Sequence, residues 1–125
     1  MVPMTSSRLS IRIVLANGRK LGPGKIALLE AIAAHGSISG AARSLGISYR
    51  GAWISLASIN SVLRDPAVAT KIGGHRRGGA ALTPIGERVL ALYRAIQNRA
   101  QSAAANELHH GTSPRPSWEG QEIVT

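Results

Sequence analysis

The first part of the chain alternates hydrophobic with mostly polar positions. Every second position from Leu9 to Leu15 is apolar, with Ile11 and Ile13 between them. Successive side chains of a β-strand point to opposite faces of its sheet, so this alternation is typical of a strand with one buried face. The pattern predicts a half-buried strand over Arg8–Ala16 that ends at Asn17-Gly18.

Helical spacing replaces this alternation after the turn-rich segment Gly22-Pro23-Gly24. We expect a first helix over Lys25–His35 that ends at Gly36, because glycine readily adopts the left-handed conformation at a helix end. The positions expected to face the core are Ile26, Leu29, Ile32 and Ala33.

Two further helices are expected in quick succession. A short Ala-rich helix covers Gly40–Leu45, capped by Ser37-Ile38-Ser39 and ended by Gly46. A longer helix starts at Tyr49 and runs toward Arg64, before a proline stops it. Its expected buried stripe is Ala52, Leu56, Ile59 and Leu63.

A hairpin and a last helix complete the predicted domain. Val68–Ile72 and Ala80–Thr83 are short strand candidates, joined by a loop of glycines and basic residues. Thr83-Pro84 then opens a helix that reaches about Ala105. We expect one domain over residues 1–105 and a disordered or weakly ordered polar tail over 106–125, which lacks periodicity.

Charge and composition narrow the class of function. The formal net charge is +9, and residues 1–104 hold 14 Lys and Arg against 3 Asp and Glu. Such an excess favours a polyanionic partner, because Lys and Arg that neutralise phosphates release condensed counterions. The chain has no cysteine, which excludes disulfides, thiolate metal sites and cysteine nucleophiles.

The segment 39–53 carries the strongest motif. In a helix-turn-helix the first helix needs a small residue where the second crosses it, a glycine at the turn, and apolar residues that lock the angle. Ala42, Gly46, and the pair Leu45 and Ile47 fill these places. We therefore expect a mainly α protein with small β structure: a winged helix-turn-helix with a long C-terminal dimerisation helix.

The start of the second motif helix would enter the major groove of DNA, with the basic hairpin as a wing on the phosphates. Arg50 can donate two hydrogen bonds to guanine O6 and N7. The candidate DNA-binding residues are Ser37, Ser39, Ser48, Tyr49, Arg50, Trp53, Lys71, His75, Arg76 and Arg77. Three alternatives stay open: a plain helical hairpin with a solvated Arg50, a core or dimer role for Trp53, and a solvated flexible loop.

The last helix has an apolar face that is too long for a small domain to cover. Pairing with a second copy would bury it. The residues expected in this dimer contact are Ile85, Val89, Leu92, Tyr93 and Ile96. The alternative is that this face packs back on the helix Lys25–His35.

The sequence resembles the N-terminal domain of the ModE-type molybdate-responsive regulators, whose winged helix is similar to that of LysR-type regulators. The segments that carry the resemblance are His35–Ser39, Gly46–Trp53, Gly73–Ala80 and Leu82–Arg88. The resemblance covers about residues 9–100, and the Gly-Ile-Ser-Tyr-basic-x-Ala-Trp run is specific to that family. The resemblance implies a homodimer on an inverted repeat, with Ile11 and Ile13 of the N-terminal strand also in the dimer contact.

One departure from the family pattern affects the expected ligand. Members that sense molybdate carry a second region of small β-barrel domains, whereas this sequence ends in a short polar tail. We therefore expect no cofactor in this chain. It would act alone or form mixed dimers with a full-length ModE-type relative.

Other classes of function find little support in the sequence. Gly18–Lys25 lacks the spacing of a phosphate loop. His109-His110 lie in the tail without another His, a Cys or a preorganised carboxylate pair to form a metal or acid–base site, so we expect no enzyme and no metal. No apolar stretch approaches the roughly 20 residues that span a bilayer, and no signal peptide is evident, so we expect a cytoplasmic, nucleoid-associated location. The main rivals are a nonspecific nucleoid protein and a protein-interaction module.

Overall fold

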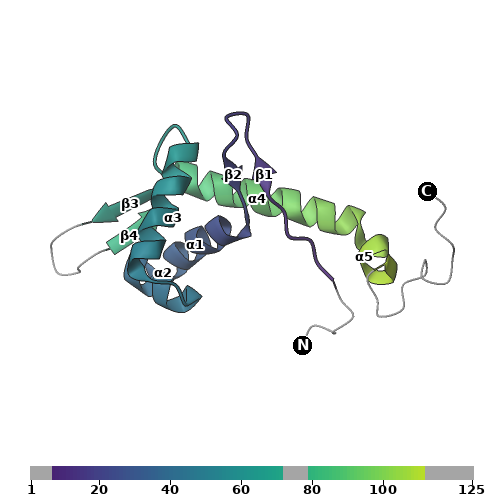
Figure 1. Cartoon of the computed structure of the whole chain (residues 1–125), viewed down its shortest axis with the longest axis horizontal. Helices are drawn as coiled ribbons and strands as arrows, with labels where there is room; N and C mark the ends of the chain where they lie inside the picture. The colour runs from purple at the N-terminus through teal and green to yellow at the C-terminus, as the bar shows by residue number, and fades with distance from the viewer. Residues whose placement is uncertain (1–6, 72–78, 112–125) are drawn as a thin grey trace. The chain divides into compact units, whose positions relative to one another are not determined.

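The computed structural model describes residues 7–71 and 79–111. The elements are β1 (Ile13–Val14), β2 (Lys20–Leu21), α1 (Pro23–His35), α2 (Ile38–Leu45), α3 (Tyr49–Val62), β3 (Val68–Lys71), β4 (Gly79–Leu82), α4 (Pro84–Ala103) and α5 (Ala105–Gly111) (Figure 1). The chain divides into two compact units, residues 11–94 and residues 1–10 with 95–125. The expectation of a mainly helical protein with small antiparallel sheets is confirmed.

Helix ends lie close to the predicted positions because the capping residues act as expected. Gly36 and Gly46 both adopt the left-handed conformation, with φ of 69° and 67°, and their N–H groups bind carbonyls of the preceding helix. Pro23 stands in the first turn of α1, where its missing N–H costs no helical hydrogen bond. Helices α1 and α2 each begin two residues earlier than predicted.

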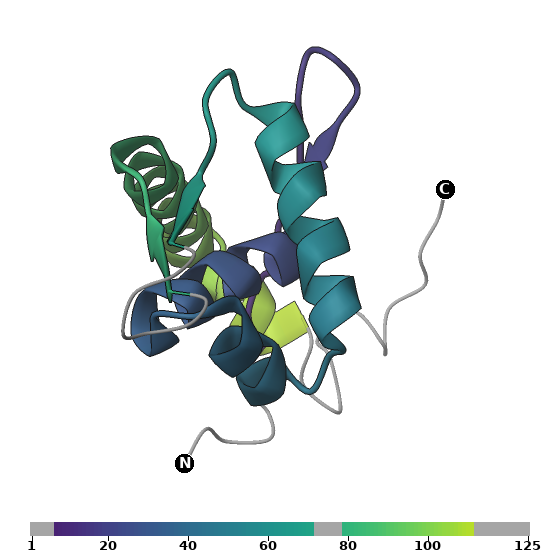
Figure 2. The same ribbon diagram turned by 90° about the vertical axis from the view of Figure 1, so that its left-hand side faces the viewer.

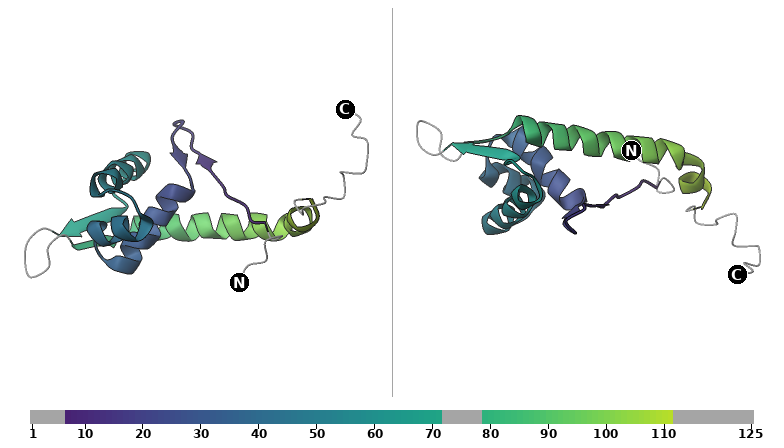
Figure 3. Two further views of the ribbon diagram at one scale, coloured as in Figure 1. Left: turned by 60° about the horizontal axis from the view of Figure 1, so that its bottom comes forward. Right: turned by 90° about the horizontal axis from the view of Figure 1, so that it is seen from above.

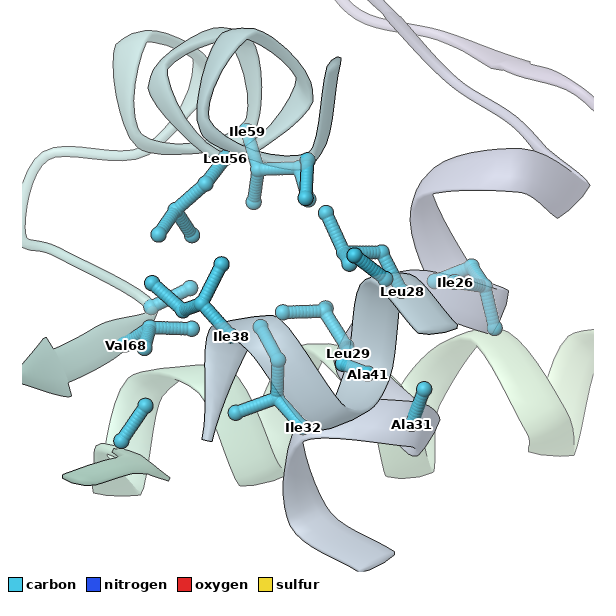
Figure 4. Close-up of a cluster of buried hydrophobic side chains, with 14 of the residues drawn as sticks. Ile26, Leu28, Leu29, Ala31, Ile32, Ile38, Ala41, Leu56, Ile59 and Val68 are labelled. Atoms are coloured by element: carbon cyan, nitrogen blue, oxygen red, sulfur yellow. The ribbon is translucent and has the colours of Figure 1, made fainter. Parts of the chain in front are cut away.

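The core of residues 11–94 lies between α1, α2 and α3 and reaches the first residue of β3 (Figure 4). The side chains of Leu29, Ile32 and Ile59 are fully buried there. Leu28 and Ala31 are also buried, whereas Ala33 is exposed and its predicted core position is wrong. The buried surface of α1 is wider than one stripe because α1 contacts α2, α3 and β4.

The predicted strand over Arg8–Ala16 is wrong in length. Only Ile13 and Val14 pair as a strand, with Leu21 and Lys20 of β2. Exposure nevertheless alternates from residue 7 to residue 16 as expected. Packing of one face produces this alternation, while the Ile11 carbonyl accepts its hydrogen bond from the Tyr93 hydroxyl at 2.5 Å instead of from a strand.

In the unit of residues 1–10 and 95–125, glutamine side chains of α4 bind the extended N-terminal backbone. Gln101 Oε1 accepts from the Leu9 N–H at 2.7 Å, and Gln97 Nε2 donates to the Leu9 carbonyl at 3.2 Å. These side chains take the place of a neighbouring strand.

Helix α5 occupies the beginning of the predicted polar tail. The segment Ala105–Gly111 is helical, and Glu107 stands in its first turn, where a negative charge favours a helix. Residues 112–125 of the predicted tail lie outside the described residues. Among the helices in residues 7–71 and 79–111, none combines the length and apolar character needed to cross a membrane.

Candidate nucleic-acid interface

The turn between α2 and α3 is fixed by backbone hydrogen bonds. The Gly46 N–H binds the Arg43 carbonyl at 3.2 Å, and the Ile47 N–H binds the Ala42 carbonyl at 3.0 Å. Leu45 and Ile47, which were predicted to lock the angle between the helices, are 37% and 40% exposed. Ile38, Ala41 and Ala42 of α2 and Ala52 of α3 are buried.

Two serines cap the helices of this motif. Ser48 Oγ accepts from the Gly51 N–H at 2.9 Å at the start of α3, and Ser37 Oγ accepts from the Gly40 N–H at 3.0 Å at the start of α2. Each cap satisfies one of the N–H groups that a helix start leaves unpaired. Ser39 is exposed in the first turn of α2.

Helix α3 has two chemically distinct faces. Ala52, Leu56 and Ile59 are buried, as predicted. Four residues, which we call the outward face of α3, carry exposed side chains: Tyr49, Arg50, Trp53 and Ile54. Tyr49 and Trp53 form an edge-to-face ring contact with centroids 6.1 Å apart. The predicted candidates Tyr49, Arg50 and Trp53 therefore lie together, and the burial of Trp53 in the core is excluded.

Ile54 is the outward-face residue that the sequence analysis missed. Its side chain is 62% exposed, more than that of Tyr49 or Trp53. The available signal was its position four residues after Arg50, which puts both residues on the same side of a helix.

The β3–β4 hairpin extends away from α1, α2 and α3 in both views of Figure 3. Its four pairs run in antiparallel register from Val68 with Leu82 to Lys71 with Gly79. The Ala80 N–H binds the Gly36 carbonyl at 2.9 Å, so the hairpin is attached to the α1–α2 connection. Lys71 is exposed at the end of β3, whereas His75, Arg76 and Arg77 lie outside the described residues.

The base of the hairpin is closely packed against the start of α4. A Cβ atom on Gly86 would lie 2.1 Å from the Ala67 carbonyl oxygen, so only glycine fits there without movement of the backbone. Thr83 Oγ1 donates to the Pro66 carbonyl at 2.7 Å and accepts from the Gly86 N–H at 3.1 Å. These contacts fix the direction in which the hairpin leaves the core.

Helices α2 and α3 carry no acidic side chain. The sequence from residue 31 to residue 64 contains no Asp or Glu, and its arginines Arg43, Arg50 and Arg64 are all exposed. Arg19, in the β1–β2 hairpin, donates to Ser61 Oγ at 3.0 Å. Figure 2 shows this hairpin beside the C-terminal end of α3. Arg19 was not among the predicted contacts, because nothing in the sequence indicates that it lies close to this helix. Arg43 was not among them either.

The predicted dimer residues fall into three groups: exposed, buried and half-buried. Leu92 and Ile96 of α4 are 60% and 39% exposed. Tyr93 is only 2% exposed, and its hydroxyl is bound within its own chain, which removes its ring from any surface. The other predicted members, which are half-buried, are Ile11, Ile13, Ile85 and Val89.

An ion pair between Arg94 and Glu30 links α4 to α1. This ion pair supports, in part, the alternative that the last helix packs back on the helix Lys25–His35. Among the described residues, no group of three or more His, Asp or Glu side chains is placed to hold a metal ion.

Comparison with known proteins identifies the relatives of this chain. No family model matches it. It is 46% identical over 80 residues, 64% of the chain, to the molybdenum-pterin-binding protein MopB of Rhodobacter capsulatus, covering 30% of that protein. It is 39% identical over 102 residues, 80% of the chain, to the molybdenum transport protein ModE of Azotobacter vinelandii, covering 38% of it.

A third relative has a name that states its class of function. The chain is 40% identical over 81 residues, 65% of its length, to the DNA-binding transcriptional dual regulator ModE of Escherichia coli strain K12, covering 31% of that protein. The homologues are thus ModE regulators and Mop proteins, and they support a ModE-like assignment. The chain spans less than half the length of each of these three relatives.

Proposed function

We propose that this chain is a winged helix-turn-helix module that binds double-stranded DNA sequence-specifically as a homodimer and regulates transcription. The observation that carries the proposal is the outward face of α3. Tyr49, Arg50 and Trp53 are exposed at the start of a helix whose opposite face is held in the core. The similarity to ModE regulators supports the same class of function.

In this proposal the N-terminal part of α3 lies in the major groove. The Arg50 guanidinium donates two parallel hydrogen bonds to a guanine, an interaction that distinguishes it from a wrong base by about 1–3 kcal/mol. Ser48 and Tyr49 bind a neighbouring phosphate or base edge, and the positive end of the helix dipole favours the phosphate. The absence of acidic residues from 31 to 64 leaves no negative charge in that segment to oppose the approach.

The β3–β4 hairpin is the wing of the proposed module. Its attachment to Gly36 and its packing on Gly86 support a fixed direction relative to α2 and α3. Lys71 carries a positive charge at the end of β3. We propose that Lys71 and the loop residues His75, Arg76 and Arg77 contact DNA phosphates. Ser37 and Ser39 would make further contacts with the sugar-phosphate backbone.

Dimerisation would place two α3 helices in successive major grooves, about one helical turn apart, on an inverted repeat. The exposure of Leu92 and of Ile96 supports α4 as the element that pairs. Because Tyr93 is buried, the proposed contact no longer includes its ring.

The test compares variants on two DNA duplexes, one enriched by the protein from a random-sequence pool and one shuffled. Arg50→Ala removes base readout and one charge from each subunit, so we expect a loss of about 5- to 150-fold per half-site on the enriched duplex and a few-fold on the shuffled one. Arg50→Lys is the matched control, because it keeps the charge but loses the bidentate geometry. Arg50→Lys should lower the affinity for the enriched duplex and leave the affinity for the shuffled duplex unchanged.

Other outcomes identify the competing functions. Equal losses on both duplexes for Arg50→Ala would remove its readout role. Salt-sensitive binding without any enriched sequence would indicate a nonspecific nucleoid protein. A chain that binds no DNA but forms dimers with a full-length relative would be an interaction module.

A further inference from the structure

Ile54 is not explained by the function proposed above. Its side chain is 62% exposed on the outward face of α3, and Trp53 beside it is 39% exposed. Arg50, Ser48 and Tyr49 can bind bases or phosphates through hydrogen bonds, whereas an isoleucine side chain has no donor or acceptor. An exposed isoleucine at this position therefore requires an apolar partner if it takes part in recognition.

The chemistry of the major groove offers one such partner. Among the groups that base edges present there, the C5-methyl of thymine is apolar, while the others are hydrogen-bond donors and acceptors. A methyl group against the Ile54 side chain would bury apolar surface on both sides of the contact.

Helix geometry limits where that methyl group lies. Arg50 and Ile54 are four residues apart, and a rise of about 1.5 Å per residue separates them by roughly 6 Å along α3. Successive base pairs are about 3.4 Å apart along each strand, so this separation corresponds to about two base-pair steps. Trp53 lies between them in sequence, and its edge-to-face contact with Tyr49 restricts its ring beside the same surface.

We infer that Ile54 is a specificity-determining residue that contacts the C5-methyl of a thymine about two base pairs from the guanine bound by Arg50. This inference rests on the proposed function. The absence of acidic residues from 31 to 64 favours DNA over a basic protein surface as the occupant of this face.

Deoxyuridine tests the contact directly, because it differs from thymidine only by the missing methyl group. Each thymine of the enriched duplex is replaced in turn, and the affinity of the unaltered chain and of Ile54→Ala is measured for every duplex. Losing one buried methyl group weakens binding by about fourfold. We expect the unaltered chain to show this loss at a position about two base pairs from the guanine.

The coupling between the two changes decides the inference. On the thymine duplex, Ile54→Ala should weaken binding by a similar or larger factor, and deoxyuridine at the sensitive position should then cause no further loss. Val14→Ala is the matched control, because Val14 is also 62% exposed but lies in β1. It should retain the full sensitivity to deoxyuridine.

Two results would overturn the inference while leaving the proposed function intact. One is sequence-specific binding that is insensitive to deoxyuridine at every position. The other is a loss from Ile54→Ala that multiplies independently with the loss from deoxyuridine. Failure to enrich any sequence would instead contradict the proposed function itself.

Discussion

The two faces of α3 differ in burial although they share one backbone. Leu56 and Ile59 are 2% and 0% exposed and pack against α1 and α2, whereas Tyr49 and Ile54 on the other side are 56% and 62% exposed. The fold and the proposed recognition therefore depend on different residues of the same helix. It follows that stability and DNA affinity can be altered separately.

The largest expected loss of stability comes from shortening an apolar side chain on the buried face of α3, and the matched change on the outward face should have almost none. Leu56→Ala removes buried methyl groups and leaves a cavity, so the free energy of unfolding should fall by about 2–5 kcal/mol. Ile54→Ala changes an exposed position and should alter it by less than about 0.5 kcal/mol. Urea unfolding at one fixed protein concentration measures both, and equal losses would mean that Ile54 is packed in solution.

Two glycines extend the comparison to the base of the hairpin. Gly86→Ala would bring a Cβ atom within 2.1 Å of the Ala67 carbonyl oxygen, and overpacking of this kind destabilises by about 1–3 kcal/mol. Gly24→Ala in the first turn of α1 meets no atom within 4 Å and should not destabilise. Thermal unfolding distinguishes the two variants. A Gly86→Ala chain as stable as the original would show that the hairpin base moves freely.

Ser48 caps the N-terminus of α3. Ser48→Ala removes the acceptor for the Gly51 N–H and should lower the free energy of unfolding by about 1 kcal/mol. Ser39→Ala is the control, since Ser39 is exposed within the first turn of α2. Hydrogen exchange of the α3 amides should increase in Ser48→Ala only. Unchanged exchange in that variant would contradict a capping role for the hydroxyl.

The smallest change in stability is expected for an ion pair that lies outside α3. Glu30→Gln removes the ion pair with Arg94, in which both side chains are about 40% exposed. Partly exposed pairs contribute about 0–1 kcal/mol, and the contribution should decrease further in high salt. DNA affinity should stay unchanged, and a change at constant stability would mean that α1 and α4 influence the outward face of α3.

Much of the helical structure could be predicted because local chemistry determines it. Gly36 and Gly46 end their helices in the left-handed conformation, and Ser48 caps α3, as their residue types indicate. The buried positions Leu56 and Ile59 follow from helical spacing.

The sequence-based predictions fail where contacts between segments distant in the chain determine the structure. The apolar alternation from Leu9 to Leu15 predicted a strand over Arg8–Ala16, but the Ile11 carbonyl has its partner in a tyrosine 82 residues away. The steric need for Gly86 depends on the Ala67 carbonyl, which its own neighbours do not reveal. Neither contact is visible in a local pattern.

The candidate site was predicted in part. Tyr49, Arg50 and Trp53 were found from the motif and lie on one exposed face. Ile54 was missed because a search guided by charge and hydrogen bonding overlooks an apolar side chain. Arg19 was missed because its contact with Ser61 crosses from the β1–β2 hairpin to α3.

The central claim is that the chain recognises a DNA sequence, and the ratio of two dissociation constants tests it most directly. The first is measured on the duplex enriched from a random pool and the second on a shuffled duplex, in the same buffer at near-physiological salt. Sequence-specific binding by a dimer predicts an inverted repeat in the enriched duplex and a preference of roughly 10³-fold or more for it. A ratio close to one, with both affinities falling steeply as salt rises, would contradict it.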